Sequence, residues 1–227
     1  MPQVRVLAVT HGPAVQPELF GDVVSEHGHE LDLWDIRTQG PPPRGADAVF
    51  VFGGDQNVGE ELTHPWLHDE YDALRQFVDD ETPLFTVCLG AQTLARAFGA
   101  EVTSLGMPLA GFYATTLTEE GVSDPVLGVL PRRFDALNAN GYAFTWPSTA
   151  VVLADGPVPQ AYRIGRRAWA VQFHPEVRRD QVLEWFHEMP DLPRTLDDLE
   201  RELDEKLPAW QELGRRLASA FLRAAAA

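Results

Sequence analysis

The chain has 227 residues, of which 44% are hydrophobic and 23% are charged. A chain of this length and composition can bury the hydrophobic core of one main domain. Its formal net charge of −16 repels phosphate backbones and disfavours binding to nucleic acids. No run approaches the ~18 apolar residues that a membrane span needs. The first residues are typical of a strand rather than of a signal peptide. We therefore expect a cytoplasmic protein that binds neither nucleic acids nor membranes.

The first half of the chain alternates between apolar strands and amphipathic helices. Strands are expected at residues 4–10, 30–34, 48–52 and 83–87, and helices at residues 17–27, 64–80 and 91–98. The strands are rich in β-branched and aromatic residues and alternate little, as buried parallel strands do. This order of elements predicts βαβ units and a parallel sheet.

The second half changes character. Residues 101–164 consist of short β-prone runs broken by Gly, Pro and Asn, which predicts antiparallel strands or a long excursion. A buried strand at 168–173 and a helix at 177–188 return to the first pattern. The tail from Asp197 predicts two helical segments separated at Pro208. Its apolar stripe favours packing on the domain, with a homodimer as the alternative.

The chain's only cysteine lies where the strand at 83–87 runs into a helix. A single cysteine excludes an intrachain disulfide and a cysteine-based metal site. A sharp turn at Cys88 would aim the N-terminus of the following helix at its thiol, which favours a reactive thiolate. Gly90 fits the close backbone approach of such a turn. The alternative is that Cys88 only ends a core strand.

The strand at 168–173 runs into His174-Pro175-Glu176. Two residues further along an extended backbone, a side chain returns to the same face, so Glu176 can orient the ring of His174. The alternative is a surface histidine followed by an acidic residue at a helix start. The paired glycines Gly53 and Gly54 end a third strand, where backbone N–H groups can hold a negative oxygen.

Together, CLGAQ at 88–92, HPE at 174–176 and the glycines at 53–54 resemble the class I (triad-type) glutamine amidotransferases. The chain is most similar to stand-alone members that are like the glutaminase domain of GMP synthase. The resemblance covers roughly residues 4–185 and includes HPWLHDE at 64–70. It implies a flavodoxin-like open, mostly parallel sheet with helices on both faces in residues 1–190. A helical extension, residues 191–227, would pack on it.

By this resemblance, Cys88 attacks the side-chain amide of glutamine, and the N–H groups of Gly54 and Leu89 hold the oxyanion. His174 protonates the departing ammonia and then activates the water that hydrolyses the γ-glutamyl thioester. Glu176 orients His174. The resemblance implies no cofactor and no metal.

The expected substrate-binding residues are Gly53, Gln92, Asn140, Gly141 and Tyr142. The related proteins usually carry a Trp-His-Gly-Asp-like stretch in the glutamine pocket, where this chain reads NANGYAF at 138–144. Asn140 and Tyr142 replace the His and the Asp, which changes the chemistry of the pocket more than that of the nucleophile. A γ-glutamyl amide or peptide is therefore the alternative substrate.

Three functions remain open at this point. The chain is an ammonia-producing partner of a synthase, a self-sufficient hydrolase of a γ-glutamyl compound, or a non-catalytic relative that binds a small amide or a partner. His64 and His68 have a zinc-compatible i, i+4 spacing but lack the carboxylate of an HExxH motif. Surface or capping roles are expected for them and for the remaining histidines, including His11.

Overall fold

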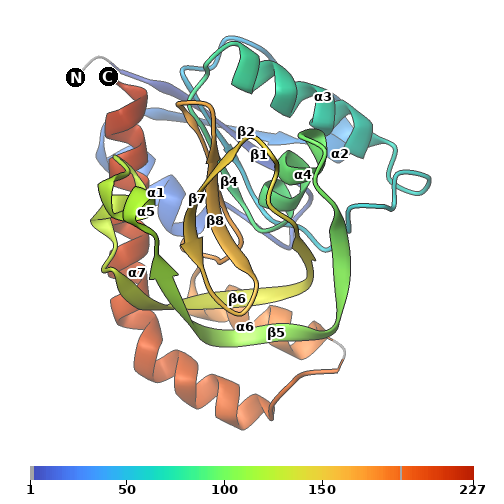
Figure 1. Ribbon diagram of the computed structural model, residues 1–227, viewed down its shortest axis with the longest axis vertical. Coiled ribbons are helices and arrows are strands. Elements are labelled where there is room, and N and C mark those ends of the chain that lie inside the picture. Colours follow the sequence, from blue (N-terminus) through green and yellow to red (C-terminus); the bar gives the residue numbers. More distant parts are fainter. Residues whose placement is uncertain (1–2, 190) are drawn as a thin grey trace.

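The computed structural model describes residues 3–189 and 191–227, and Figure 1 shows it as a ribbon. The strands of this part of the chain form one nine-stranded sheet in the order β2-β1-β3-β4-β9-β8-β7-β5-β6. The parallel half contains β1 (Arg5–Thr10), β2 (Glu30–Asp35), β3 (Ala48–Val51), β4 (Leu84–Val87) and β9 (Ala168–Val171). The antiparallel half contains β5 (Val102–Leu117), β6 (Arg133–Phe144), β7 (Ala150–Asp155) and β8 (Pro159–Ile164).

Helices cover both faces of the parallel half. On one face, α1 (Glu18–Glu26), α6 (Arg179–Glu188) and α7 (Leu196–Ala225) pack into a core rich in phenylalanine. On the other face, α3 (Trp66–Asp79) and α4 (Leu89–Ala97) form a second core. The short helices are α2 (Ile36–Gln39), α5 (Glu119–Ser123) and the 3-10 turn η1 (Leu127–Val129). Because both faces are covered, β3 and β4 are buried at every position.

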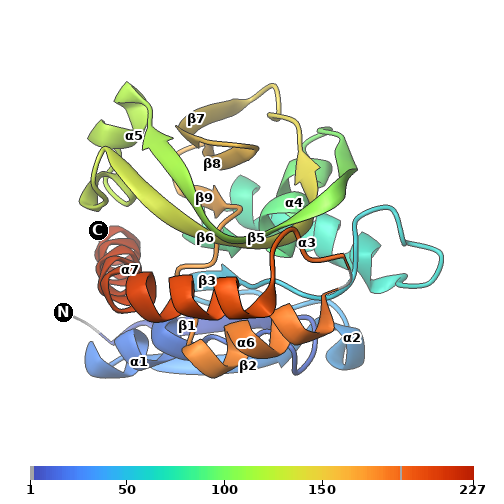
Figure 2. The same cartoon turned by 90° about the horizontal axis from the view of Figure 1, so that it is seen from below.

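This topology confirms the predicted α/β class with a mostly parallel sheet core and a β-rich excursion. The excursion is the long, curved ribbon of β5 and β6 in Figure 2, joined to the parallel strands through β7 and β8. The predicted strands and helices of the first half lie where expected, with bounds that differ by at most a few residues.

The predicted break of the tail at Pro208 is wrong. The described helix α7 is continuous from Leu196 to Ala225, with Pro208 inside it. Proline removes one backbone N–H and crowds the preceding turn, which bends a helix or ends it. Here Leu203 before it and Leu217 after it are both buried in the same core, so packing holds the helix together across the proline. Figure 1 shows that α7 changes direction along its length.

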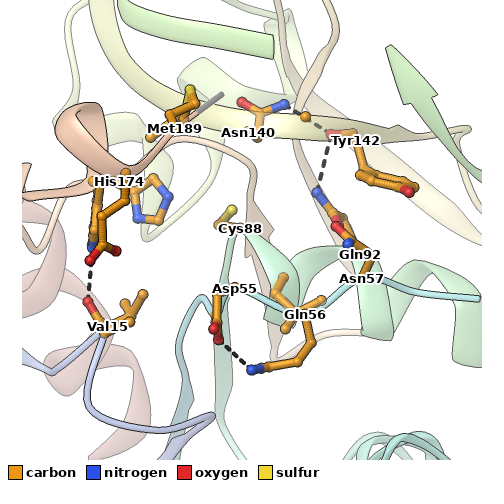
Figure 3. A pocket seen from close by; sticks show the side chains of 17 residues that line it. Val15, Asp55, Gln56, Asn57, Cys88, Gln92, Asn140, Tyr142, His174 and Met189 are labelled. Atoms are coloured by element: carbon orange, nitrogen blue, oxygen red, sulfur yellow. Dashed lines mark hydrogen bonds between the residues drawn. The ribbon is translucent and has the colours of Figure 1, made fainter. Parts of the chain in front are cut away.

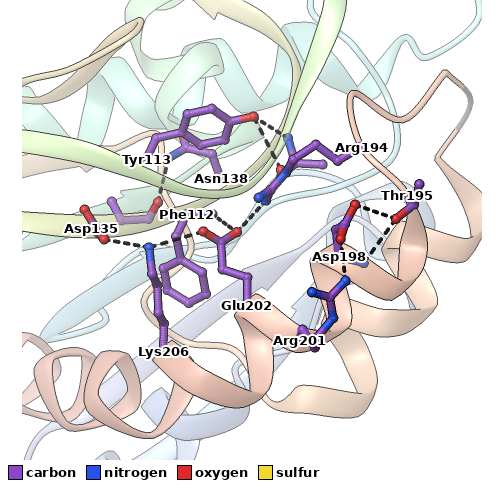
Figure 4. Close-up of polar contacts among 12 residues, drawn as sticks. Phe112, Tyr113, Asp135, Asn138, Arg194, Thr195, Asp198, Arg201, Glu202 and Lys206 are labelled. Carbon is purple, nitrogen blue, oxygen red and sulfur yellow. Dashed lines mark hydrogen bonds and ion pairs between the residues drawn. The ribbon is translucent and has the colours of Figure 1, made fainter.

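Polar contacts tie the first turns of α7 to the β5–β6 ribbon (Figure 4). Lys206 Nζ donates to Asp135 Oδ2 at 2.7 Å, and Glu202 accepts a hydrogen bond from the N–H of Phe112 at 3.3 Å. The hydroxyl of Thr195 caps the N-terminus of the helix. These contacts hold α7 against β6, which forms one wall of the cavity described below.

The division of the chain into residues 1–190 and 191–227 stays a prediction, and its boundary at residue 190 lies outside the described residues. None of the helices in the part of the chain that the structure describes has the length and apolar character needed to cross a membrane.

Candidate active site

Cys88 lies on a sharp elbow between β4 and α4. Its backbone has φ 51° and ψ −108°, a left-handed conformation that costs roughly 1–3 kcal/mol for a residue with a side chain. Its N–H donates to Val171 O at 2.9 Å, and its carbonyl accepts from the N–H of Gln92 at 3.0 Å. The elbow is therefore held by β9 on one side and by the first turn of α4 on the other.

Gly90 allows this helix to begin so close to the sheet. Its N–H donates to Phe52 O at 3.2 Å, and a Cβ atom built on it would lie 2.5 Å from Val51 O. Any other residue would push α4 away from the end of β3. The glycine predicted from the sequence to permit a close approach has that role.

His174 and Glu176 follow β9 and are buried. The N–H of His174 donates to Leu137 O at 2.9 Å, and its ring Nδ1 lies 2.8 Å from Glu176 Oε1. Trp210 Nε1 donates to His174 O at 2.7 Å. Burial by itself would lower the pKa of His174, but the charges of Glu176 and Cys88 raise it to about 10. The ring is thus held in place and favours its protonated form.

Cys88 and His174 line the same cavity, which has a volume of about 250 Å³. Figure 3 shows both side chains around this space, with Asn140 and Gln92 on other sides of it. Of the residues predicted to form the site, eight line the cavity: Gly54, Cys88, Leu89, Gln92, Asn140, Gly141, Tyr142 and His174. Glu176 and Gly53 are buried behind this lining.

Gly53 is packed tightly between the two candidate catalytic side chains. A Cβ atom on it would lie 3.1 Å from His174 Cε1 and 3.5 Å from Cys88 Cβ. The structure therefore places Gly53 behind Cys88 and His174, where it gives them room, and not on the lining of the cavity.

The wall opposite the elbow is formed by β6. The main-chain carbonyl of Tyr142 accepts hydrogen bonds from Asn140 Nδ2 at 2.9 Å and from Gln92 Nε2 at 3.1 Å. The other side-chain atom of Asn140, Oδ1, is buried and has no hydrogen-bond partner among the described residues. Gln92 therefore links α4, the helix that follows Cys88, to this wall.

Gln172 is part of the site and was not predicted. Its Nε2 lies 3.5 Å from Cys88 Sγ, and its Oε1 accepts from Gln92 Nε2 at 3.1 Å. Gln172 precedes His174 by two residues, and on an extended backbone that spacing puts both side chains on one face. The spacing that linked His174 to Glu176 could also have identified it.

His11 and Glu70 form a buried pair beside the glycine loop, so the expected surface or capping role of His11 is wrong. His11 is 1% exposed, and its Nε2 lies 2.5 Å from Glu70 Oε2. Both residues belong to elements that meet at the same edge of the sheet, since His11 follows β1 directly and Glu70 lies in the first turns of α3. The HPWLHDE stretch contained the glutamate, but its partner is 59 residues away in the sequence.

The fold and this geometry define an α/β protein with a cysteine on a strand-to-helix elbow and a histidine–carboxylate pair beside it. The family model "Glutamine amidotransferase class-I" matches residues 22–182. The chain therefore belongs to the class I glutamine amidotransferase family.

Individual relatives agree with this assignment. A glutamine-hydrolyzing GMP synthase subunit of Thermoplasma volcanium is 30% identical over 166 residues, which are 70% of this chain and 77% of that protein. A carbamoyl phosphate synthase small chain of Bartonella bacilliformis is 27% identical and matches 57% of this chain and 31% of its own length.

Solved structures share the fold over almost the whole chain. A glutamine amidotransferase from Thermotoga maritima superposes with a TM-score of 0.84 at 21% identity, covering 98% of this chain and 99% of that one. A glutamine amidotransferase from Methylobacillus flagellatus gives a TM-score of 0.86 at 19% identity, covering 97% and 95%. At this level of identity the likeness supports the fold and not the substrate.

Proposed function

We propose that this protein hydrolyses the side-chain amide of glutamine through a thioester on Cys88, with His174 and Glu176 completing the catalytic machinery. The observation that carries the proposal is the shared cavity. A cysteine on a strained elbow faces it together with a histidine whose other ring nitrogen is held by Glu176 at 2.8 Å. Family membership supports the same chemistry.

In the first half of the reaction, the Cys88 thiolate attacks the amide carbon and forms a C–S bond. The negative charge moves to the amide oxygen, which the N–H groups of the lining residues Gly54 and Leu89 stabilise in this proposal. His174 gives its proton to the amide nitrogen as the C–N bond breaks. Ammonia leaves, and a γ-glutamyl thioester remains on Cys88.

In the second half, neutral His174 takes a proton from a water molecule as the water attacks the thioester. The C–S bond breaks, glutamate leaves, and the thiolate and the protonated histidine are restored. The Glu176 carboxylate stabilises the imidazolium in both halves, because the hydrogen bond to Nδ1 and the negative charge both favour it.

The fate of the ammonia is the second part of the proposal. Relatives of this chain are named as part of a glutamine-hydrolyzing GMP synthase and as the small chain of a carbamoyl phosphate synthase. We propose by analogy that a synthase partner receives the ammonia in the cytoplasm.

A γ-glutamyl amide is the second candidate substrate, favoured by the charge of the cavity. Asp55 and Glu188 lie on its lining, whereas no Lys or Arg does among the described residues. The buried acceptor Asn140 Oδ1 adds a further site for an N–H group of the substrate. These features favour a substrate that carries an ammonium group on the amine side of the amide.

The first test is covalent labelling with a glutamine-mimicking diazo-ketone, read as mass gain for the wild type and for Cys88→Ala. We expect one label per chain on the wild type and none on the variant. The same preparations are then assayed for glutamate release from glutamine and from a γ-glutamyl amide of a diamine. Release from glutamine supports the first substrate, and release from the diamine amide alone supports the second.

Lack of both labelling and glutamate release in the wild type, with Cys88 still alkylated by iodoacetamide, would contradict hydrolysis by this chain alone. The glutamate-release assay is then repeated in the presence of an ammonia-using synthase. Glutamate release only with the synthase indicates a partner-dependent enzyme, and no release indicates a non-catalytic relative.

A further inference from the structure

A chain of buried hydrogen bonds runs from the glycine loop into the core. His11 Nδ1 lies 2.9 Å from Gly53 O, and His11 Nε2 lies 2.5 Å from Glu70 Oε2. The hydroxyl of Thr93 donates to Glu70 Oε1 at 2.5 Å. The side chains of His11 and Glu70 are 0% and 2% exposed, and Thr93 is fully buried. A buried histidine–carboxylate pair is costly to desolvate, so its presence here needs an explanation.

The first contact fixes the orientation of one peptide group. The carbonyl of Gly53 and the N–H of Gly54 belong to the same planar unit, which is trans, so they point in opposite directions. A hydrogen bond that holds the Gly53 carbonyl toward His11 therefore turns the Gly54 N–H away from His11. Gly54 lies on the wall of the cavity that also contains Cys88.

The glycine loop does not hold this orientation through side chains of its own. Glycine has the widest choice of backbone conformations, and two consecutive glycines leave a peptide group that rotates easily. The space for them is also limited, because a Cβ atom on Gly54 would lie 2.8 Å from His11 Cβ and 3.0 Å from Leu89 Cδ2. An external contact must therefore select one orientation.

Both nitrogens of the His11 ring face acceptors, namely a carbonyl and a carboxylate. An N–H is needed at Nδ1, because the Gly53 carbonyl can only accept. Burial works against a charged ring, but Glu70 and the bond to Gly53 raise the pKa of His11 above its usual value. A protonated ring also polarises the peptide and strengthens its N–H as a donor.

We propose that His11 and Glu70 are positioning residues that fix the Gly53–Gly54 peptide so that its N–H points at the oxyanion. This inference rests on the proposed hydrolysis at Cys88. Thr93 lies in α4, the helix that begins at Leu89, so Glu70 is hydrogen-bonded directly to the helix that carries one proposed oxyanion donor. Through His11 it is also linked to the glycine loop that carries the other. The pair thereby sets the two donors relative to each other.

The test compares two substitutions that each keep one half of the contact. In His11→Asn, the side-chain NH₂ replaces Nδ1 and keeps the donor to Gly53. In His11→Gln, the longer amide reaches toward Glu70 and the donor to Gly53 is lost. Glu70→Gln removes the charge and keeps the shape. His68→Gln, at an exposed histidine of α3, is the control.

We expect kcat for glutamate release to fall about 10²-fold in His11→Gln, as for loss of one oxyanion donor, with KM changed less than about threefold. His11→Asn should recover at least about tenfold of that loss, Glu70→Gln should lose about tenfold, and His68→Gln should match the wild type. Alkylation of Cys88 by iodoacetamide forms no oxyanion, so its rate should be unchanged in all four variants.

Equal losses in His11→Asn and His11→Gln, accompanied by slower alkylation, would overturn the proposal in favour of general damage to the site. A wild-type kcat in His11→Gln would overturn it as well. Crystal structures of the wild type and His11→Gln read the orientation of the Gly53–Gly54 peptide without any substrate. A rotated peptide in the variant supports the positioning role even where the wild type releases no glutamate, and an unrotated one contradicts it.

Discussion

The two walls of the cavity are held in different ways. On the nucleophile wall, formed by Cys88 and His174, main-chain hydrogen bonds to β9, to Phe52 after β3, and to β6 hold Cys88, Gly90 and His174. The β6 wall lies in an antiparallel ribbon whose register shifts between Ser104 and Leu109, opposite Tyr142 and Asn140. The first wall is tied to three segments of the main chain, whereas the second lies beside an irregularity of the β5–β6 pairing. We therefore propose that the first wall carries the chemistry and that the second wall selects the substrate.

The largest effect should come from removing the proposed nucleophile. Cys88→Ala is expected to lower kcat on the order of 10⁵-fold, because the acyl intermediate cannot form. Cys88→Gly should be equally inactive but more stable than Cys88→Ala by about 1 kcal/mol, since glycine adopts the left-handed backbone without strain. Urea unfolding of the two variants measures this difference. Equal stabilities would show that the elbow is not strained.

The next largest effect should come from removing the charge of Glu176, which lies behind the same wall. Glu176→Gln should lower kcat on the order of 10³- to 10⁴-fold, because the imidazolium loses its stabilising charge. The folded pKa of His174, about 10, lies above its ordinary value of 6.5, so the pair contributes stability that is present below pH 6.5 and lost as the pH rises toward 10. Unfolding measured from about pH 6 to 10 should show this decline in the wild type and a flatter profile in the variant. The same slope in both would contradict the pairing.

Substitutions on the β6 wall should change the preference between substrates more than they change kcat. Asn140→His combined with Tyr142→Asp introduces the two residue types that the family resemblance leads us to expect at these positions. It should shift kcat/KM toward glutamine over the γ-glutamyl diamine amide by about 10- to 100-fold, as for one or two hydrogen bonds to a charged group. Tyr142→Phe is the control, because Asn140 and Gln92 donate to the main-chain carbonyl of Tyr142. A collapse of kcat for both substrates would show that this wall also takes part in the chemistry.

The sequence was most informative where local rules coincide with global packing. A buried strand that ends in Cys88 and is followed two residues later by Gly90 predicted an elbow, with a plain strand end as the alternative, and the structure has the elbow. At Pro208 the local signal and the packing disagree. The proline predicted a break, but apolar contacts of α7 on both sides of it keep the helix continuous. The pairing of His11 with Glu70 could not be predicted from the sequence, because a contact between residues 59 positions apart leaves no periodic pattern in a single sequence.

The smallest expected effects are those of replacing one glycine on each wall by alanine, measured as changes in the free energy of unfolding and in KM. Gly90→Ala brings a methyl group within 2.5 Å of Val51 O and 3.1 Å of Phe52 O, so it should destabilise the fold by about 1–3 kcal/mol as overpacking does. A Cβ atom on Gly141 meets nothing within 4 Å, so Gly141→Ala should leave the free energy of unfolding within about 0.5 kcal/mol of the wild type. Because Gly141 still lines the cavity, its methyl group should raise KM without lowering alkylation of Cys88. Denaturant unfolding and steady-state kinetics of the two variants measure both effects. A destabilised Gly141→Ala would mean that the β6 wall is as tightly constrained as the nucleophile wall, and substrate choice would then have to be sought elsewhere on the cavity lining.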